Sequence, residues 1–158
     1  MSVQVDIQKA TAEPVPEEGD IRRWISAALV DHPADTEILV RMVDCDEMST
    51  LNLSYRGKPG ATNVLSFPAE LPAELCLPLL GDIVICAPLV LLEASQQHKP
   101  LQAHWAHLVV HGTLHLLGYD HIEEEEAVAM ELLETTILAT LDYPCPYSQS
   151  IPMEHSQR

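Results

Sequence analysis

The 158-residue chain has little positive charge: it contains 8 Lys and Arg residues against 24 Asp and Glu residues, which gives a formal net charge of −16. Nucleic-acid-binding proteins usually gain affinity by neutralising phosphates with Lys and Arg, so a broadly basic binding surface is excluded. Two small basic clusters remain, Arg22-Arg23 and Arg56 with Lys58. If the chain binds RNA, we expect a local basic spot, weak salt-sensitive affinity and recruitment by a partner.

The chain also lacks paired cysteine motifs, a leader pattern and a long apolar run. Its four cysteines, at positions 45, 76, 86 and 145, show no C-x-x-C spacing, which argues against a thiolate zinc ribbon or a redox pair. The most apolar stretch, residues 75–92, is interrupted by prolines, a glycine and an aspartate, so it cannot supply the roughly 20 apolar residues of a membrane-spanning helix. We expect a cytoplasmic protein with reduced thiols and no membrane contact.

What is present suffices for one domain, because 47% of the residues are hydrophobic and a chain of this length can bury about two thirds of its unfolded surface. Period-2 alternation and turn residues predict strands over residues 3–7, 37–43, 62–67 and 81–86. Helices are predicted over residues 20–30, 44–55, 89–97, 101–117 and 122–141, with Asp20 and Asp44 as N-caps.

This order of elements predicts an α+β fold, in which about five helices pack on a small mixed sheet of about four strands. The domain is expected to occupy residues 1–147. Residues 148–158 are expected to form a disordered tail, because prolines cluster just before and within the end of the chain.

Three histidines with H-x3-H-x5-H spacing form the candidate metal site. His111 and His115 are one helical turn apart and therefore share a face, about 6 Å apart along the axis. Gly118 gives the chain a place to leave the helix, and the turn can bring His121 back as a third ligand. Three nitrogen ligands leave a fourth tetrahedral position open, as in catalytic zinc sites.

Two more histidines, His104 and His107, fall on nearly the same helix face. A triplet of His107, His111 and His115 spans about 12 Å along the axis, too far for one ion. We interpret His104 and His107 as packed histidines or as hydrogen-bond partners of the ligands. The alternative for the whole set is a group of unrelated core histidines. Imidazole also binds nickel, copper and iron, so the metal is not fixed by ligand type alone.

The carboxylates near this segment divide into two kinds. H-E-x-x-H metalloproteases use the Glu after the first histidine as general base, and this chain has Gly112 there. The run Glu123–Glu126 is interpreted as a solvated first helical turn. Asp120 is the better candidate, because it can orient a histidine ligand or handle protons during catalysis.

The segment from His111 to His121, HGTLHLLGYDH, resembles the H-G-x-L-H-L-x-G-Y-D-H signature of the YbeY family at every defined position. Residues 51–58 (LNLSYRGK) and 62–68 (TNVLSFP) are similar to the family blocks L-N-x-x-Y-R-G-K and T-D-V-L-S-F-P, with Asn63 where many members have Asp. Residues 81–86 are similar to the family's G-D-I-x-I strand. The resemblance extends from about residue 3 to residue 147.

The resemblance implies an α+β fold, one zinc ion on the three histidines, and endonucleolytic cleavage of single-stranded RNA. It also implies maturation of the 3′ end of small-subunit ribosomal RNA and ribosome quality control, with a small-subunit ribosomal protein and a ribosome-associated GTPase as partners. Arg56 matches an arginine implicated in family catalysis. A guanidinium can hold two phosphate oxygens, so this role is chemically reasonable.

Two other functions are open from the sequence. One is a zinc peptidase that binds an extended peptide along the strand at residues 62–67, although Gly112 replaces the usual base. The other is a non-enzymatic ribosome-assembly factor whose structural zinc takes a fourth protein ligand such as His107. The acidic charge favours this second alternative, because basic ribosomal proteins suit an acidic surface.

Overall fold

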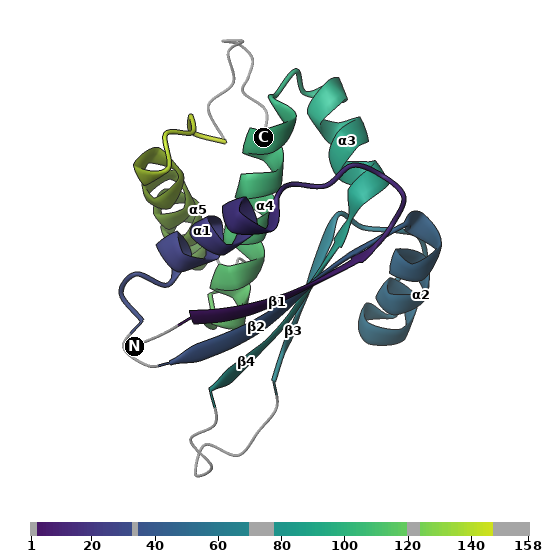
Figure 1. The fold of residues 1–158 in the computed structure, drawn as a ribbon, viewed down its shortest axis with the longest axis horizontal. Helices are drawn as coiled ribbons and strands as arrows, with labels where there is room; N and C mark the ends of the chain where they lie inside the picture. The colour runs from purple at the N-terminus through teal and green to yellow at the C-terminus, as the bar shows by residue number, and fades with distance from the viewer. Residues whose placement is uncertain (1–2, 33–34, 70–77, 120–123, 147–158) are drawn as a thin grey trace.

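A computed structural model describes residues 3–32, 35–69, 78–119 and 124–146 (Figure 1). Within them, four strands form one sheet in the order β1-β2-β4-β3. The strands are β1 (Val3–Ala10), β2 (Thr36–Val43), β3 (Val64–Pro68) and β4 (Leu79–Cys86). β1, β2 and β4 run parallel, whereas β3 pairs antiparallel with β4. The sheet is therefore mixed, with β1 and β3 as its edges.

Five helices in the described ranges accompany the sheet, so the predicted single-domain α+β fold is confirmed. They are α1 (Glu18–Ala28), α2 (Cys45–Arg56), α3 (Ala87–Gln96), α4 (Leu101–Leu116) and α5 (Glu124–Thr140). The prediction of Asp20 as an N-cap is wrong: the first helix starts earlier, at the cap residue Glu17, and Asp20 lies within its first turn. Asp44 does occupy the N-cap position of α2, but its side chain makes no capping bond and accepts a hydrogen bond from Thr11.

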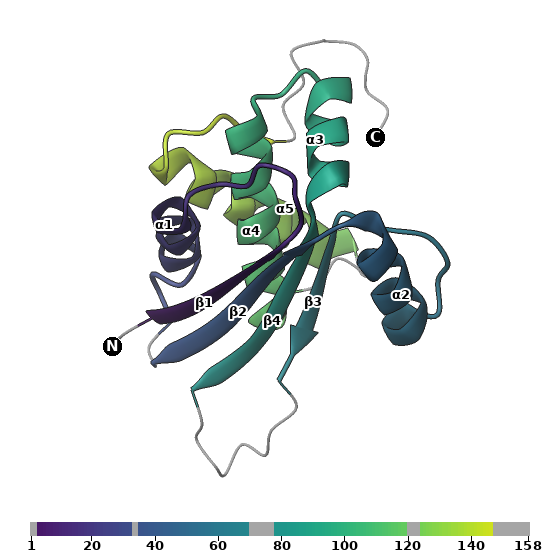
Figure 2. The same ribbon diagram turned by 45° about the vertical axis from the view of Figure 1, so that its right-hand side comes forward.

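Helices α1, α4 and α5 gather on one side of the sheet (Figures 1 and 2). The main core lies between them and the sheet, and includes Trp24 of α1, Val40 of β2, Ile83 of β4 and Trp105 of α4, each at most 2% exposed. Helix α4 contacts α1, α3, α5 and the sheet. Its sequence is apolar on most sides because it is the central helix.

The opposite face of the sheet carries a smaller cluster beside β3, where α2 packs. Val43, Met48, Leu65, Val84 and Cys86 form this cluster. The ring of Tyr55, near the end of α2, packs on Phe67 of β3 with centroids 4.3 Å apart. β3 therefore lies between the carboxyl-terminal end of α2 on one face and α4 on the other.

Several predicted features lie outside the described residues. They are the tail at 148–158, most of the loop at 68–78, the beginning of the fifth helix at 122–123, and the candidate residues Asp120 and His121. Among the helices that the structure does describe, none is long and apolar enough to cross a membrane.

Candidate active site

A cleft of about 600 Å³ runs along β3. Three parts of the chain line it: Tyr55 and Arg56 at the end of α2, residues 62–66 and Pro68 in and before β3, and His111, His115, Gly118 and Tyr119 at the end of α4. Three of the residues predicted from the sequence, Arg56, His111 and His115, thus meet in one cavity although up to 59 positions separate them in the sequence.

The imidazoles of His111 and His115 are arranged as a pair of ligands. Their Nε2 atoms lie 3.1 Å apart, and the ring centroids are separated by 4.5 Å. Two nitrogens that each bind one zinc ion at 2.0–2.1 Å with tetrahedral angles are about 3.3 Å apart. The separation of the two nitrogens is therefore compatible with one shared ion.

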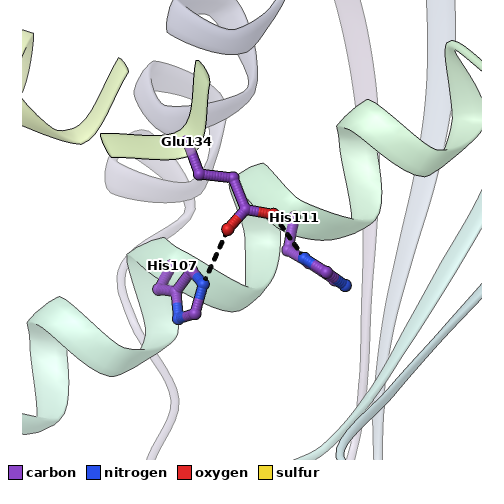
Figure 3. A group of neighbouring side chains, drawn as sticks. All are labelled: His107, His111 and Glu134. Carbon is purple, nitrogen blue, oxygen red and sulfur yellow. Dashed lines mark hydrogen bonds and ion pairs between the residues drawn. The ribbon is translucent and has the colours of Figure 1, made fainter. Parts of the chain in front are cut away.

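Glu134 of α5 fixes the orientation of His111 (Figure 3). Its side chain is 0% exposed, and its two oxygens contact two rings: Oε1 lies 3.0 Å from His107 Nε2, and Oε2 contacts His111 Nδ1. An ionised carboxylate only accepts hydrogen bonds, so both ring nitrogens are assigned as N–H donors. A proton on Nδ1 of His111 leaves the lone pair on Nε2, which faces His115.

A second possible ion-binding group shares one of these residues. Ligand atoms of His107, His111 and Glu134 lie within 4.8 Å of one another. This group would use Nδ1 of His111, whereas the pair with His115 would use Nε2. Because the Glu134 carboxylate is fully buried, an ion there would be out of reach of a large substrate, whereas one between His111 and His115 would face the cleft.

The other two histidines of α4 are held by carboxylates, as expected for packed rings. Burial lowers the pKa of His107 despite the opposing effect of Glu134. The Nε2 atom of His104 lies 2.8 Å from Glu93 Oε1, and the residue is 4% exposed. Glu93 also accepts hydrogen bonds from Asn63, at 3.1 and 3.3 Å. Asn63, which stands at the position of the family's Asp, thus joins the cleft to α3.

Gly112 has a packing role that explains why no glutamate follows His111. A Cβ atom at this position would lie 2.9 Å from Ile83 Cγ2 and 3.2 Å from Ser66 Oγ. The Ser66 hydroxyl donates to the Gly112 carbonyl at 3.0 Å. Position 112 therefore faces the sheet, and a longer side chain there would run into β3 and β4. A general base of the H-E-x-x-H kind cannot come from this position.

Arg56 stands at the other wall of the cleft, as the last residue of α2. Gly57 ends the helix in the left-handed conformation, with φ of 70°, and its N–H donates to the Leu53 carbonyl at 3.0 Å. The buried side chain of Asn52 donates to the Gly60 carbonyl at 2.9 Å, which holds the following turn. These contacts fix the point at which the Arg56 side chain leaves the backbone.

The charge of Arg56 is not matched by a carboxylate within the part of the chain that is described. Each of the other arginines described there has an acidic partner: Arg22 pairs with Glu18, Arg23 with Asp20, and Arg41 with Glu47. The Arg56 side chain is exposed and lines the cleft. Its guanidinium is therefore available for an anion.

The end of α4 behaves as the sequence predicts. Gly118 has φ of 104° and lies where the chain leaves the helix. Gly118 and Tyr119 line the cleft. Asp120 and His121 follow directly in the sequence, but their positions are outside the described residues.

Glu134 is not among the site residues predicted from the sequence, although a signal for it exists. Met130, Ile137 and Leu138 are buried, and Glu134 falls at the helical spacing that puts it on the same face. A glutamate in an apolar stripe is almost always paired when buried. That pattern could have identified Glu134 as a buried carboxylate with a partner, although not which residues it contacts.

Paired imidazoles, a buried carboxylate behind them and, across an open cleft, an arginine with no acidic partner among the described residues are typical of metal-dependent hydrolases. Comparison with known families agrees with the hydrolase part of this class. Residues 5–142 match the family model described as Endoribonuclease YbeY. The chain belongs to the YbeY family.

Individual relatives support this membership. The chain is 54% identical over 149 residues to Endoribonuclease YbeY of Cellvibrio japonicus, covering 93% of this chain and 84% of that protein. It is 56% identical over 147 residues to Endoribonuclease YbeY of Pseudomonas putida strain F1, covering 92% and 94%. The solution structure of TM1509 from Thermotoga maritima shares the fold, with a TM-score of 0.59, 22% identity, and coverage of 96% of this chain and 100% of that one.

Proposed function

We propose that the chain is a zinc-dependent, single-strand-specific endoribonuclease whose substrate lies in the cleft along β3. Its family gives the class of enzyme: an endoribonuclease, which is a hydrolase that acts on phosphodiester bonds. The observation that carries the metal-dependent chemistry is the pair of Nε2 atoms of His111 and His115, 3.1 Å apart in the cleft that also contains Arg56.

In this proposal His111, His115 and His121 hold one zinc ion. Glu134 keeps the Nδ1 proton on His111 and thereby directs the Nε2 lone pair into the cleft. Zinc in this position supplies Lewis acidity, which stabilises negative charge on an oxygen of the scissile phosphodiester. Asp120 orients a histidine ligand or carries a proton, of which the first role is the simpler one.

Arg56 binds the phosphodiester from the opposite wall. Cleavage builds negative charge on the phosphate oxygens, and a guanidinium can donate two parallel hydrogen bonds to them. Lys58 adds positive charge two residues further on. The lack of a carboxylate partner for Arg56 among the described residues supports this role. An arginine already in an ion pair would have to break that ion pair before it could bind a phosphate.

The cellular role that we propose is maturation of the 3′ end of small-subunit ribosomal RNA and ribosome quality control in the cytoplasm. A small-subunit ribosomal protein and a ribosome-associated GTPase are the proposed partners. The net charge of −16 supports recruitment through a basic protein. Residues 1–147 would form the catalytic domain and residues 148–158 a tail outside it.

The test is cleavage of an end-labelled single-stranded RNA by metal-quantified protein. We expect Arg56→Ala to lower the rate about 10²- to 10³-fold while zinc is retained, as for the loss of one charge-stabilising donor. His115→Ala should lose both zinc and cleavage. Arg22→Ala, a surface arginine already paired with Glu18, is the matched control and should cut at the wild-type rate.

The same experiment separates the alternatives. Cleavage products that end in a 2′,3′-cyclic phosphate would assign the attack to the RNA 2′-OH, and other ends would assign it to water. A fully metal-loaded wild type that leaves RNA intact would contradict the proposal and favour the non-enzymatic assembly factor. Cleavage of a peptide that requires His115 would favour the peptidase.

A further inference from the structure

β3 is an edge strand, and its inner side alone is paired in the described part of the chain. In the strand order β1-β2-β4-β3 it has β4 as its neighbour. The pairing is antiparallel and in register, with Ser66 opposite Ile83. In such a ladder, alternate residues direct their N–H and C=O groups toward the neighbouring strand, and the residues between direct theirs away from it.

Two hydrogen bonds fix which residues face which way. The Asn63 carbonyl accepts from the Cys86 N–H at 2.9 Å, and the Ala69 N–H donates to the Leu80 carbonyl at 3.0 Å. The odd-numbered residues from 63 to 69 therefore direct their backbone groups toward β4.

It follows that Val64, Ser66 and Pro68 direct their backbone groups outward. Pro68 fits this alternation, because a residue without an N–H is tolerated where no ladder bond is required. The outward donors are thus the amides of Val64 and Ser66. They are separated by two residues of strand, which is about 7 Å.

The residues that carry these outward groups line the cleft. Val64, Leu65 and Ser66 all line it, although successive side chains of a strand point to opposite faces of the sheet. A cavity that touches both faces must run past the edge between them. Arg56 stands on one wall of this cavity and His111 on the other.

We propose that the free edge of β3 is a backbone-binding subsite for the RNA strand, in which the amides of Val64 and Ser66 donate to oxygens of consecutive phosphates. This inference rests on the proposed function and adds how the substrate is held. Adjacent phosphates of an extended single strand repeat at a distance similar to that between the two amides. A single strand laid along β3 passes between Arg56 and the His111–His115 pair, so one of its phosphodiesters reaches both walls.

The occupant is RNA and not a peptide for two reasons. An extended peptide can pair with a free strand edge, but it has no regular negative charge to match Arg56. Phosphates supply that charge, and they accept hydrogen bonds from backbone N–H groups readily. The relatives are also named endoribonucleases.

Amide NMR of the full-length, metal-loaded protein tests the proposal directly. The probe is a single-stranded 2′-O-methyl oligoribonucleotide, whose integrity is checked by electrophoresis after the measurement. We expect the N–H signals of Val64 and Ser66 to shift and their hydrogen exchange to slow, while those of Leu65 and Phe67, already in the ladder, change little. The same oligonucleotide with uncharged methylphosphonate linkages should leave all four unchanged.

Proline substitutions supply a second readout. Ser66→Pro and Val64→Pro each remove one outward N–H without removing a bond to β4, and each should weaken RNA affinity about tenfold, the value of a hydrogen bond to a charged group. Ser66→Ala is the control, because it removes the hydroxyl and keeps the amide. Thermal unfolding shows whether each variant is folded, and the wild-type NMR result holds even if a proline variant is not.

Three results would overturn the inference: no response of the outward amides to RNA, a response to an extended peptide in place of RNA, or equal RNA affinity of folded Ser66→Pro and Ser66→Ala. These outcomes are separate from failure of the proposed function. If RNA is cleaved but the outward amide signals do not change, the proposed nuclease function is supported and the proposed subsite is contradicted. If the outward amide signals shift on addition of RNA but RNA is never cleaved, the subsite is supported and the nuclease function is contradicted.

Discussion

Each half of helix α4 contains a histidine that pairs with a glutamate of a neighbouring helix. The two pairs differ in what surrounds the other nitrogen of the histidine ring. In the amino-terminal half, His104 pairs with Glu93 of α3 and is 4% exposed. In the carboxyl-terminal half, His111 pairs with Glu134 of α5 (Figure 3). Its other ring nitrogen lies 3.1 Å from Nε2 of His115. Both glutamates connect a neighbouring helix to α4 through a contact with a histidine ring.

The difference lies in the second ring nitrogen. The Nδ1 atom of His104 is buried and has no hydrogen-bond partner among the residues that the structure describes. The Nε2 atom of His111 instead meets a second imidazole where the sheet edge leaves an opening. The pair at the amino-terminal half is thus enclosed by the core, whereas the pair at the carboxyl-terminal half leaves a ring nitrogen at the cleft, where we propose that a metal binds.

We expect the largest difference between the two halves of α4 to be in their effect on metal affinity. Glu134→Gln keeps the shape of the side chain but accepts fewer hydrogen bonds, so His111 loses its fixed tautomer. We expect zinc to bind about 10- to 100-fold more weakly, as when a carboxylate behind a metal-bound histidine is lost. The measurement is a competition titration with a zinc chelator.

Glu93→Gln is the matched control and should leave zinc affinity unchanged, since His104 does not reach the cleft. Complete loss of zinc from Glu134→Gln, together with retention by His115→Ala, would contradict this assignment. That pattern would show that the ion is held by His107, His111 and Glu134.

The sequence predicts local features of this helix well and long-range ones poorly. His111 and His115 could be paired because helical periodicity fixes their relative position, and Gly118 marks the helix end. The fold class also followed from periodicity and the order of elements. The partnership of Glu134 with His107 and His111 could not be derived, because nothing in a single sequence gives the rotation of α5 against α4.

The same limit applies to Arg56 and β3. Spacing within residues 51–68 shows a helix end, a turn and a strand, but not that this strand forms the edge beside α4. Helix starts were also less well predicted: Asp20 looks like an N-cap, yet α1 begins at Glu18. Asn63 stands where many family members have Asp, and the structure shows that its amide donates to Glu93, a contact set by packing between distant segments.

A smaller effect should follow from the packing of α4 against the sheet, which sets the depth of the cleft. Gly112→Ala places a Cβ atom 2.9 Å from Ile83 Cγ2, so the helix or the strand must shift. We expect the free energy of unfolding to fall by about 1–3 kcal/mol, the usual cost of overpacking. Urea denaturation of the full chain measures it.

Gly19→Ala is the control for the general effect of replacing a helical glycine. Nothing lies within 4 Å of a Cβ atom at position 19, so the substitution should be neutral or stabilising by up to about 1 kcal/mol through helix propensity. Equal stability changes in the two variants would show that close approach at Gly112 does not limit the helix position.

The smallest expected effect is a pH dependence confined to the amino-terminal half of α4. Burial alone would raise the pKa of Glu93, but the hydrogen bonds from His104 and Asn63 outweigh it and lower that pKa below its ordinary value. A carboxyl with a lowered folded pKa stabilises the fold above its unfolded pKa, near pH 4.3, and loses this contribution as pH falls through the folded value. We therefore expect Glu93→Gln to cost about 1 kcal/mol at pH 7.

The difference between Glu93→Gln and wild type should shrink as pH falls below about 4, because wild-type Glu93 then takes up a proton and resembles glutamine in charge. Urea denaturation at pH 7, 5 and 3.5 gives the comparison. A difference that stays constant over this range would mean that the pair acts through shape and not through charge. The amino-terminal half of α4 would then be held by packing alone, and its contrast with Glu134, which we propose orients a metal ligand, would be sharper.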